Sequence, residues 1–217
     1  MGVGVELQSV LCEVETAAGR TAQRRARRRR RGSDEVAVFL AVHDTDTGDL
    51  LTTYHWVRTG VDSDDLLVVR HTVLDAAGST DDVTVTVVGY EIDGRGSTEK
   101  LAAAKFEDFR QSVTASDRGL ALRRRPARTA ARVLLVPPLA RRVLQDDVIM
   151  LDRFRVTAAD VRGPAVPPVE RDEPSGDVPG LSVEGTWDRV GALLRAARRY
   201  RSREEHSSYL VRLTFEL

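Results

Sequence analysis

Hydrophobic and polar residues alternate at both ends of this 217-residue chain. Over positions 3–11, a mostly apolar set alternates with a mostly polar set: Val3, Val5, Leu7, Ser9 and Leu11 against Gly4, Glu6, Gln8 and Val10. Near the carboxyl terminus, one face carries only large apolar residues: Tyr209, Val211, Leu213, Phe215 and Leu217. A period of two residues is typical of half-buried strands, so we predict strands over residues 3–14 and 209–217.

Residues 35–43 are apolar at nearly every position, which is the pattern of a strand that is covered on both faces. Further runs rich in Val, Thr, Leu and aromatic residues are separated by turn-forming Asp, Gly and Ser; they span residues 50–57, 66–74, 83–90, 132–136 and 148–157. We predict strands for all of them, and the short spacing of those before residue 91 indicates an antiparallel meander.

Two segments show a helical period instead. Over residues 97–113, apolar side chains recur at helical steps, namely Ala102, Phe106, Phe109 and Val113. We predict an amphipathic helix there that begins at Ser97 and covers an edge or end of the sheets. Residues 186–200 repeat the pattern with Trp187, Val190, Leu194 and Ala197, which predicts a second helix.

The expected fold is therefore mainly β: an antiparallel β-sandwich with one or two peripheral α-helices. We expect one domain over residues 1–217, since 41% hydrophobic residues can form a substantial core. It carries a basic insertion at 20–33 and a proline-rich loop at 163–180. Cys12 is the single cysteine, so no intramolecular disulfide forms. The sequence has no evident signal peptide or apolar membrane span, and we expect a cytoplasmic protein.

Four short segments carry a resemblance to a known family. They read LQSVLCEVET (7–16), DEVAVFL (34–40), QDDVIMLDRFRVTAAD (145–160) and SSYLVRLTFEL (207–217). This set resembles bacterial C2-like β-sandwich domains, although the arginine insertion, the missing glycine after Ile149 and the proline-rich segment depart from their pattern. The resemblance implies a C2-like sandwich with a binding role, in which calcium can take part, and no catalysed reaction.

Charge is sorted into blocks along a chain that is neutral overall, with 33 basic and 33 acidic residues. Residues 20–31 and 118–142 hold eight arginines each and residues 195–203 hold five, all without an acid. These blocks contain 21 of the 33 basic residues. The arginines that we expect to contact a partner are Arg24, Arg25, Arg27, Arg28, Arg29, Arg30, Arg31, Arg123, Arg124 and Arg125.

This charge pattern favours a non-enzymatic interaction module that docks through its arginines to an acidic protein partner or to further copies of itself. Two alternatives stay open. The arginines can pair with acids of the same chain, or they can bind a nucleic acid or an anionic lipid surface without sequence preference.

Three groups of residues are candidates for metal or catalytic chemistry. Oxygen ligands for calcium come from Asp44, Asp46, Asp49, Asp146 and Asp147, although aspartates also stabilise ordinary turns. No other cofactor is expected. His43, His55 and His71 lie on or beside predicted strands, and converging imidazoles can bind zinc, which leaves a metal-dependent hydrolase as a further alternative. Ser97 and Lys100 have the Ser-x-x-Lys spacing of one class of nucleophile, without its supporting motifs.

Overall fold

A computed structural model describes residues 2–14, 34–92, 98–118, 148–163, 181–202 and 207–217. These residues form nine strands, two α-helices and one 3₁₀ turn. Their bounds are β1 Gly4–Val14, β2 Asp34–Asp44, β3 Leu50–Val61, β4 Leu66–Leu74, η1 Ala76–Gly78, β5 Asp82–Glu91, α2 Thr98–Arg118, β6 Val148–Thr157, α5 Ala158–Arg162, β7 Leu181–Val190, β8 Leu193–Ser202 and β9 Ser207–Glu216. The predicted strand at 132–136, the predicted helix start at Ser97 and most of the proline-rich segment lie outside the described residues.

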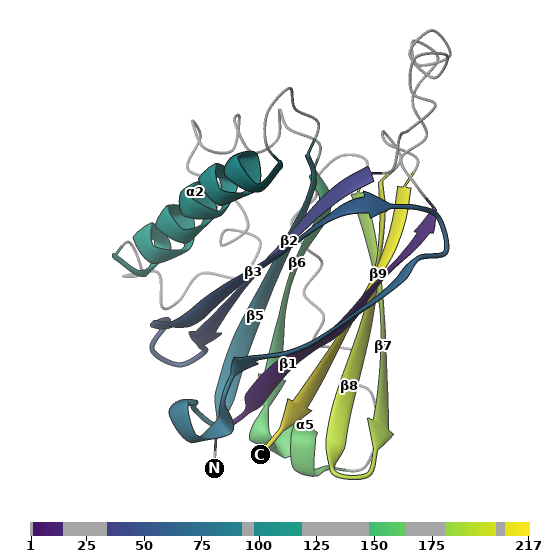
Figure 1. The fold of residues 1–217 in the computed structure, drawn as a ribbon. Helices are drawn as coiled ribbons and strands as arrows, with labels where there is room; N and C mark the ends of the chain where they lie inside the picture. The colour runs from purple at the N-terminus through teal and green to yellow at the C-terminus, as the bar shows by residue number, and fades with distance from the viewer. Residues whose placement is uncertain (1, 15–33, 93–97, 119–147, 164–180, 203–206) are drawn as a thin grey trace, which may run out of the picture.

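The strands form two antiparallel sheets that pack face to face (Figure 1). One sheet has the order β4-β1-β9-β8-β7 and the other has the order β3-β2-β5-β6. The predicted antiparallel β-sandwich with peripheral helices is confirmed. The predicted antiparallel meander is wrong, because β4 crosses to the other sheet and pairs with β1, while β5 pairs with β2 and β6, so neither of its expected strand pairings forms.

The central strands β2 and β5 of the four-stranded sheet are buried on both faces, as the apolar run in β2 predicted. One face of β2 packs into the core between the sheets, through Val36, Val38, Leu40 and Val42. Its other face, with Ala37, Phe39 and Ala41, lies under α2. The Phe39 ring is 5.4 Å from the Phe106 ring and 5.7 Å from the Phe109 ring. The first predicted helix is therefore confirmed, but it covers a sheet face instead of an edge or end.

A β-bulge changes the phase of β1 halfway along. Leu7 is opposite Leu213 of β9 and Ser9 is opposite Arg212, so Gln8 has no partner of its own in that pairing. The buried set continues beyond the bulge with Val10 and Cys12 instead of with the predicted Ser9 and Leu11. On the other side of β1, Arg70 of β4 has a φ of 50°. A bulge adds one residue to one strand, and therefore moves every later side chain to the opposite face.

The second predicted helix, over residues 186–200, is wrong. This segment forms the hairpin β7–β8, with a turn at 191–192 in which Gly191 has a φ of 63°. Alternate residues of β8 point into the sandwich: Leu194, Ala196, Arg198, Tyr200 and Ser202. Pairing with β9 selects the strand because it buries Leu194 and Tyr200 in the core, whereas Val190 and Ala197 of the helical pattern face outward.

The helices of the structure remain on the outside of the sheets. α5 begins at a capping box, in which Thr157 and Asp160 exchange hydrogen bonds between side chain and backbone. No helix among the described residues is long and apolar enough to cross a membrane.

Replacing Gly89 should destabilise the sandwich. A Cβ atom at this position of β5 would lie 2.5 Å from Cγ and 2.8 Å from Cβ of Met150, a fully buried neighbour. We expect Gly89→Ala to lower the free energy of unfolding by about 1–3 kcal/mol, measured by urea denaturation. Gly78→Ala is the matched control, since a Cβ there meets nothing within 4 Å. Equal stability of the two variants would contradict this packing.

Candidate functional site

The outer face of the five-stranded sheet carries a ladder of ion pairs near the end of β1. The guanidinium group of Arg199 donates two hydrogen bonds to Glu13, of 2.8 Å from Nε and 2.7 Å from Nη2. Ser208 donates a further hydrogen bond to Glu13, and Arg201 pairs with Glu184 at 2.6 Å. The hydrogen bond from Arg199, and then that from Ser208, lower the pKa of Glu13. With the Arg201–Glu184 pair, these bonds tie strands β1, β9, β8 and β7 together.

A groove of about 360 Å³ lies next to this ladder on the same face. One row of cross-strand neighbours runs through it, from β4 to β7: Val68, Ser9, Arg212, Ala197 and Thr186. The next row contributes Thr214, Arg195 and Asp188, and Gln8 at the bulge donates a 3.1 Å hydrogen bond to Thr214. Small residues between larger ones form the hollow, and the bulge provides its polar floor.

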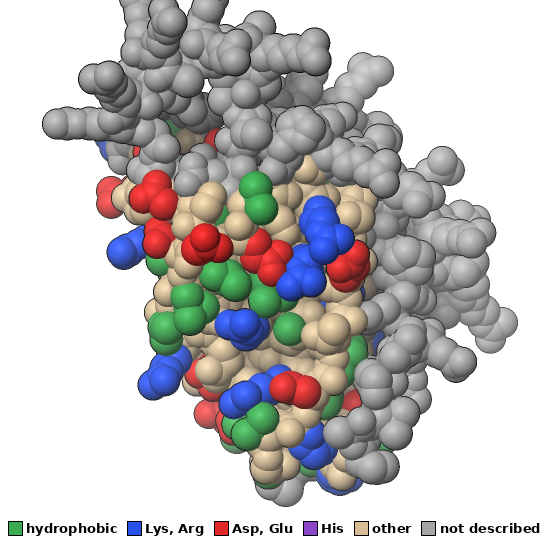
Figure 2. All heavy atoms as spheres, turned by 90° about the vertical axis from the view of Figure 1, so that its right-hand side faces the viewer, with side chains coloured by type: hydrophobic (Ala, Val, Ile, Leu, Met, Phe, Trp, Pro, Cys, Tyr) green, Lys and Arg blue, Asp and Glu red, His purple; other side chains and the backbone are tan. Residues whose placement is uncertain are grey.

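The charge of this groove is mainly positive. Its lining contains three exposed arginines, Arg70, Arg195 and Arg212, against one aspartate, Asp188. None of the three arginines forms an ion pair with another residue of the described segments. Figure 2 shows this side of the molecule, where basic side chains lie among acidic and hydrophobic ones. Guanidinium groups without a carboxylate partner are available to an external anion.

Hydrophobic side chains border the groove on the side of β4. Leu66 and Val68 expose 52% and 62% of their surface, and both belong to the groove lining. Residues of this kind are normally buried in a sheet, and two of them beside unpaired arginines form an amphipathic surface. The groove therefore offers both charged and apolar contacts to a partner.

A second polar group is buried between the two sheets. Arg198 of β8 donates from Nε to Oδ2 of Asp152 on β6 at 2.7 Å, and both side chains are at most 3% exposed. The Tyr200 hydroxyl donates to the same oxygen at 3.2 Å, and the Arg198 guanidinium lies 4.9 Å from the centre of the Phe154 ring. Burial, and then the charge of Asp152, raise the pKa of Tyr200, which keeps this donor protonated. The group links the sheets and has no exposed reactive atom.

The third arginine block therefore forms mainly ion pairs within the chain. Arg198, Arg199 and Arg201 pair with acids of the same chain, which was the alternative reading of the charge pattern. Arg195 is the one arginine of β8 that forms no ion pair among the described residues, and it lines the groove.

The arginines expected to contact a partner fall outside the described residues. These are Arg24, Arg25, Arg27, Arg28, Arg29, Arg30, Arg31, Arg123, Arg124 and Arg125. Their role stays a prediction.

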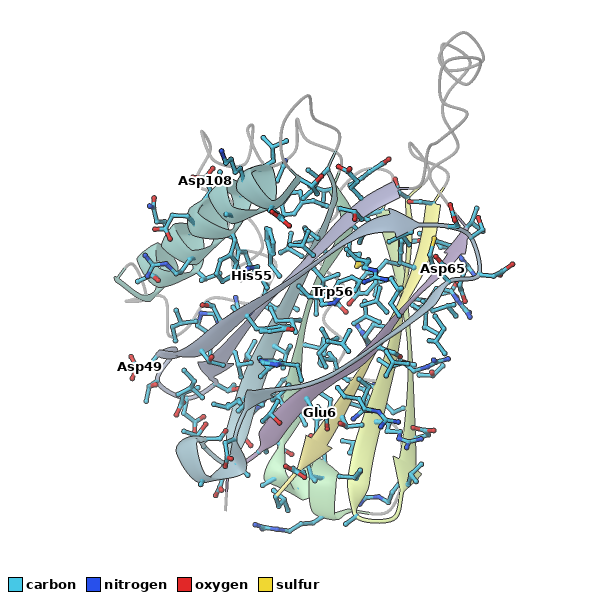
Figure 3. The ribbon with its side chains drawn as sticks, viewed as in Figure 1. Glu6, Asp49, His55, Trp56, Asp65 and Asp108 are labelled. Atoms are coloured by element: carbon cyan, nitrogen blue, oxygen red, sulfur yellow. The ribbon has the colours of Figure 1, made fainter. Side chains whose placement is uncertain are left out.

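The aspartates predicted to bind calcium are divided between a turn and the undescribed residues. Asp44 accepts two backbone hydrogen bonds of 2.8 Å, from Asp46 and Thr47, and the Thr47 bond is the largest cause of its lowered pKa. Asp49 lies at the same turn between β2 and β3, where its backbone N–H donates to the Thr47 hydroxyl at 3.1 Å (Figure 3). Asp146 and Asp147 are not described. Calcium binding stays a prediction, and turn stabilisation is the role that the structure gives to Asp44.

The three histidines of the zinc hypothesis lie in separate places. His43 is buried on the α2 side of β2, and His55 points toward α2, with its ring 4.4 Å from that of Phe106 (Figure 3). His71 stacks on Tyr54 at 4.1 Å and belongs to the other sheet. No group of three potential metal ligands occurs among the described residues. The structure thus does not bring these imidazoles together.

The Ser-x-x-Lys pair does not form a described site either. Ser97 lies outside the described residues, and Lys100 is exposed in the first turn of α2.

Comparison with known proteins gives no match, either to a protein-family model or to a curated protein.

Sequence reasoning missed both the groove and the buried pair. Arg198 occupies an inward position of β8, but the helical interpretation of this segment overlooked the two-residue period that places Arg198 there. Arg70, Arg195 and Arg212 come from three strands, and no signal in the sequence links them. Alternation in β9 did place Arg212 on the outer face, which was the one available clue.

Breaking the buried ion pair should cost much stability. Asp152→Leu leaves the Arg198 charge buried without its partner, so we expect a loss of about 3–5 kcal/mol in the free energy of unfolding. Arg198→Met should have a similar effect. The variant with both substitutions should lose less free energy of unfolding than either single variant. Chemical denaturation of all four proteins measures this coupling, and simply additive losses would contradict it.

His43 should make stability depend on pH. Burial, with a contribution from the charge of Arg153, lowers the pKa of His43 from 6.5 to about 4. The unfolded state then binds the extra proton between these values, so stability falls as the pH falls through this window. Between pH 7 and pH 4.5, we expect the free energy of unfolding of the His43→Leu variant to fall by about 2 kcal/mol less than that of the unmodified protein, measured by urea denaturation. An equal loss in both proteins would contradict the assignment.

Proposed function

We propose that this protein is a non-enzymatic, C2-like interaction module that docks through arginine-rich segments to an acidic protein partner or to further copies of itself. The observation that carries the proposal is the segregation of charge, with 21 of 33 basic residues in three blocks that contain no acid. Blocks of one sign on a neutral chain favour contacts between oppositely charged faces.

Two features of the fold support this proposal. The β-sandwich agrees with the resemblance to C2-like domains, and its sheets present strands and loops as a rigid scaffold. The outer face of the five-stranded sheet also holds Arg70, Arg195 and Arg212 without internal ion pairs among the described residues. Positive charge is thus available on the scaffold in addition to the first two arginine blocks.

A polyanion binder is the second candidate, because the run of eight arginines in residues 20–31 also suits phosphate groups. Phosphate binding without sequence preference needs only positive charge, whereas bound single strands also use exposed aromatic side chains for base stacking. The first two arginine blocks contain no aromatic residue. This composition favours an acidic protein over a single-stranded nucleic acid.

Removing the first arginine block should weaken binding to an acidic polypeptide. We expect replacement of Arg24, Arg25 and Arg27 to Arg31 by serine to reduce the affinity for polyglutamate by at least about tenfold at low salt, or ~1.4 kcal/mol. The unmodified protein should lose affinity as salt rises, because salt screens exposed charges. Fluorescence anisotropy with labelled polyglutamate measures both effects, and light scattering over the same salt range reports self-association.

Lysine at the same seven positions provides the matched control, since it keeps the charge and should retain most of the binding. The proposal fails if the unmodified protein neither binds polyglutamate nor changes its molecular mass between low and high salt. Tighter binding to single-stranded DNA or to anionic vesicles than to polyglutamate would favour the polyanion alternative.

A further inference from the structure

We propose that the groove on the outer face of the five-stranded sheet holds one extended segment of a partner protein, with acidic residues and an adjoining apolar residue. This inference rests on the proposed docking function and assigns a site to it. Only Arg195 of this site belongs to an arginine block that the sequence indicated, because Arg70 and Arg212 come from strands β4 and β9.

The first argument is the spacing of the positive charges. Arg195 is opposite Thr214, and Arg212 is two residues before Thr214 on the same strand. Diagonal neighbours of this kind are about 7–8 Å apart. Most of this separation runs along the strands, so the two arginines lie on opposite sides of a segment that crosses the sheet, and one strand spacing of about 4.8 Å separates them along it. Acidic side chains at neighbouring or alternate positions of that segment, about 3.3 and 7 Å apart, bracket this spacing.

The second argument is the length and the ends of the groove. The lining crosses all five strands, from Val68 on β4 to Thr186 on β7. The five strands are separated by four distances of about 4.8 Å, so the groove is about 19 Å long, which is the length of about six extended residues. Beyond the arginines, the segment reaches Leu66 and Val68, which are more than half exposed and can cover an apolar side chain.

The third argument separates a peptide from a nucleic acid. A phosphate backbone makes use of arginines but gains little from two exposed aliphatic side chains, whereas a peptide uses both. The polar floor, where Gln8 donates to Thr214, also suits the amide groups of an extended chain. The combination of charge, apolar surface and hydrogen-bonding groups favours an acidic peptide segment.

The test uses the full-length protein and a labelled seven-residue peptide, Ser-Glu-Ser-Glu-Ser-Leu-Ser, at low salt. We expect the double substitution Arg195→Ser and Arg212→Ser to weaken binding at least about tenfold in fluorescence anisotropy, since each charged hydrogen bond contributes substantially. Leu66→Ser with Val68→Ser should remove the preference for this peptide over Ser-Glu-Ser-Glu-Ser-Ser-Ser and leave binding of the second peptide nearly unchanged.

Arg58→Ser is the matched control, because Arg58 is exposed on β3 in the other sheet. We expect its affinity for the peptide to change less than about twofold. Melting temperatures of all variants check that the fold is intact, and the exposure of the replaced side chains makes this outcome the expected one.

The outcomes separate this inference from the proposed function. If the first-block serine variant loses binding while the Arg195 and Arg212 variant binds normally, the groove is not the site and the proposed function stands. If the unmodified protein binds neither the peptide nor polyglutamate, both fail. If single-stranded DNA displaces the peptide and its binding also requires Arg195 and Arg212, the occupant is a polyanion and the acidic peptide is wrong.

Discussion

The four-stranded sheet must be covered on both faces, and the rest of the architecture depends on this constraint. The central strands β2 and β5 place large apolar side chains on each side, so exposure of either side would leave a hydrophobic surface in water. The five-stranded sheet covers one side and α2 covers the other. The opposite face of the five-stranded sheet is left uncovered by the described elements, and it is the face that carries the groove (Figure 1).

Arginine serves two purposes in this molecule, and burial decides between them. Arg198 is enclosed with Asp152 between the sheets, where a missing partner would leave an uncompensated charge. Arg199 and Arg201 pair with acids near the surface and contribute less, since solvent screens those pairs. Arg195 lies on the same strand but faces the groove, without an ion-pair partner among the described residues. One block of the sequence thus supplies a core contact, a surface ladder and a candidate binding group.

The bulge at Gln8 in β1 connects the fold to the candidate site. It turns Val10 and Cys12 into the core and leaves Gln8 and Ser9 on the outer face, at the floor of the groove. Without the extra residue, the second half of β1 would present its apolar side chains to water. The same local irregularity therefore completes the core and shapes the surface where we place a partner.

The sequence by itself determined most strands, the sandwich and the helix α2, because alternation and helical spacing are local properties that survive in the folded chain. It also determined that basic charge lies in blocks. Tertiary structure alone decided that residues 186–200 form a hairpin, because their apolar residues follow a helical spacing and only pairing with β9, which buries Leu194 and Tyr200, selects the strand. It also decided that Arg70, Arg195 and Arg212 share a groove and that Arg198 meets Asp152. Such contacts join strands far apart in the sequence, so they arise from sheet order and register, which no local pattern contains.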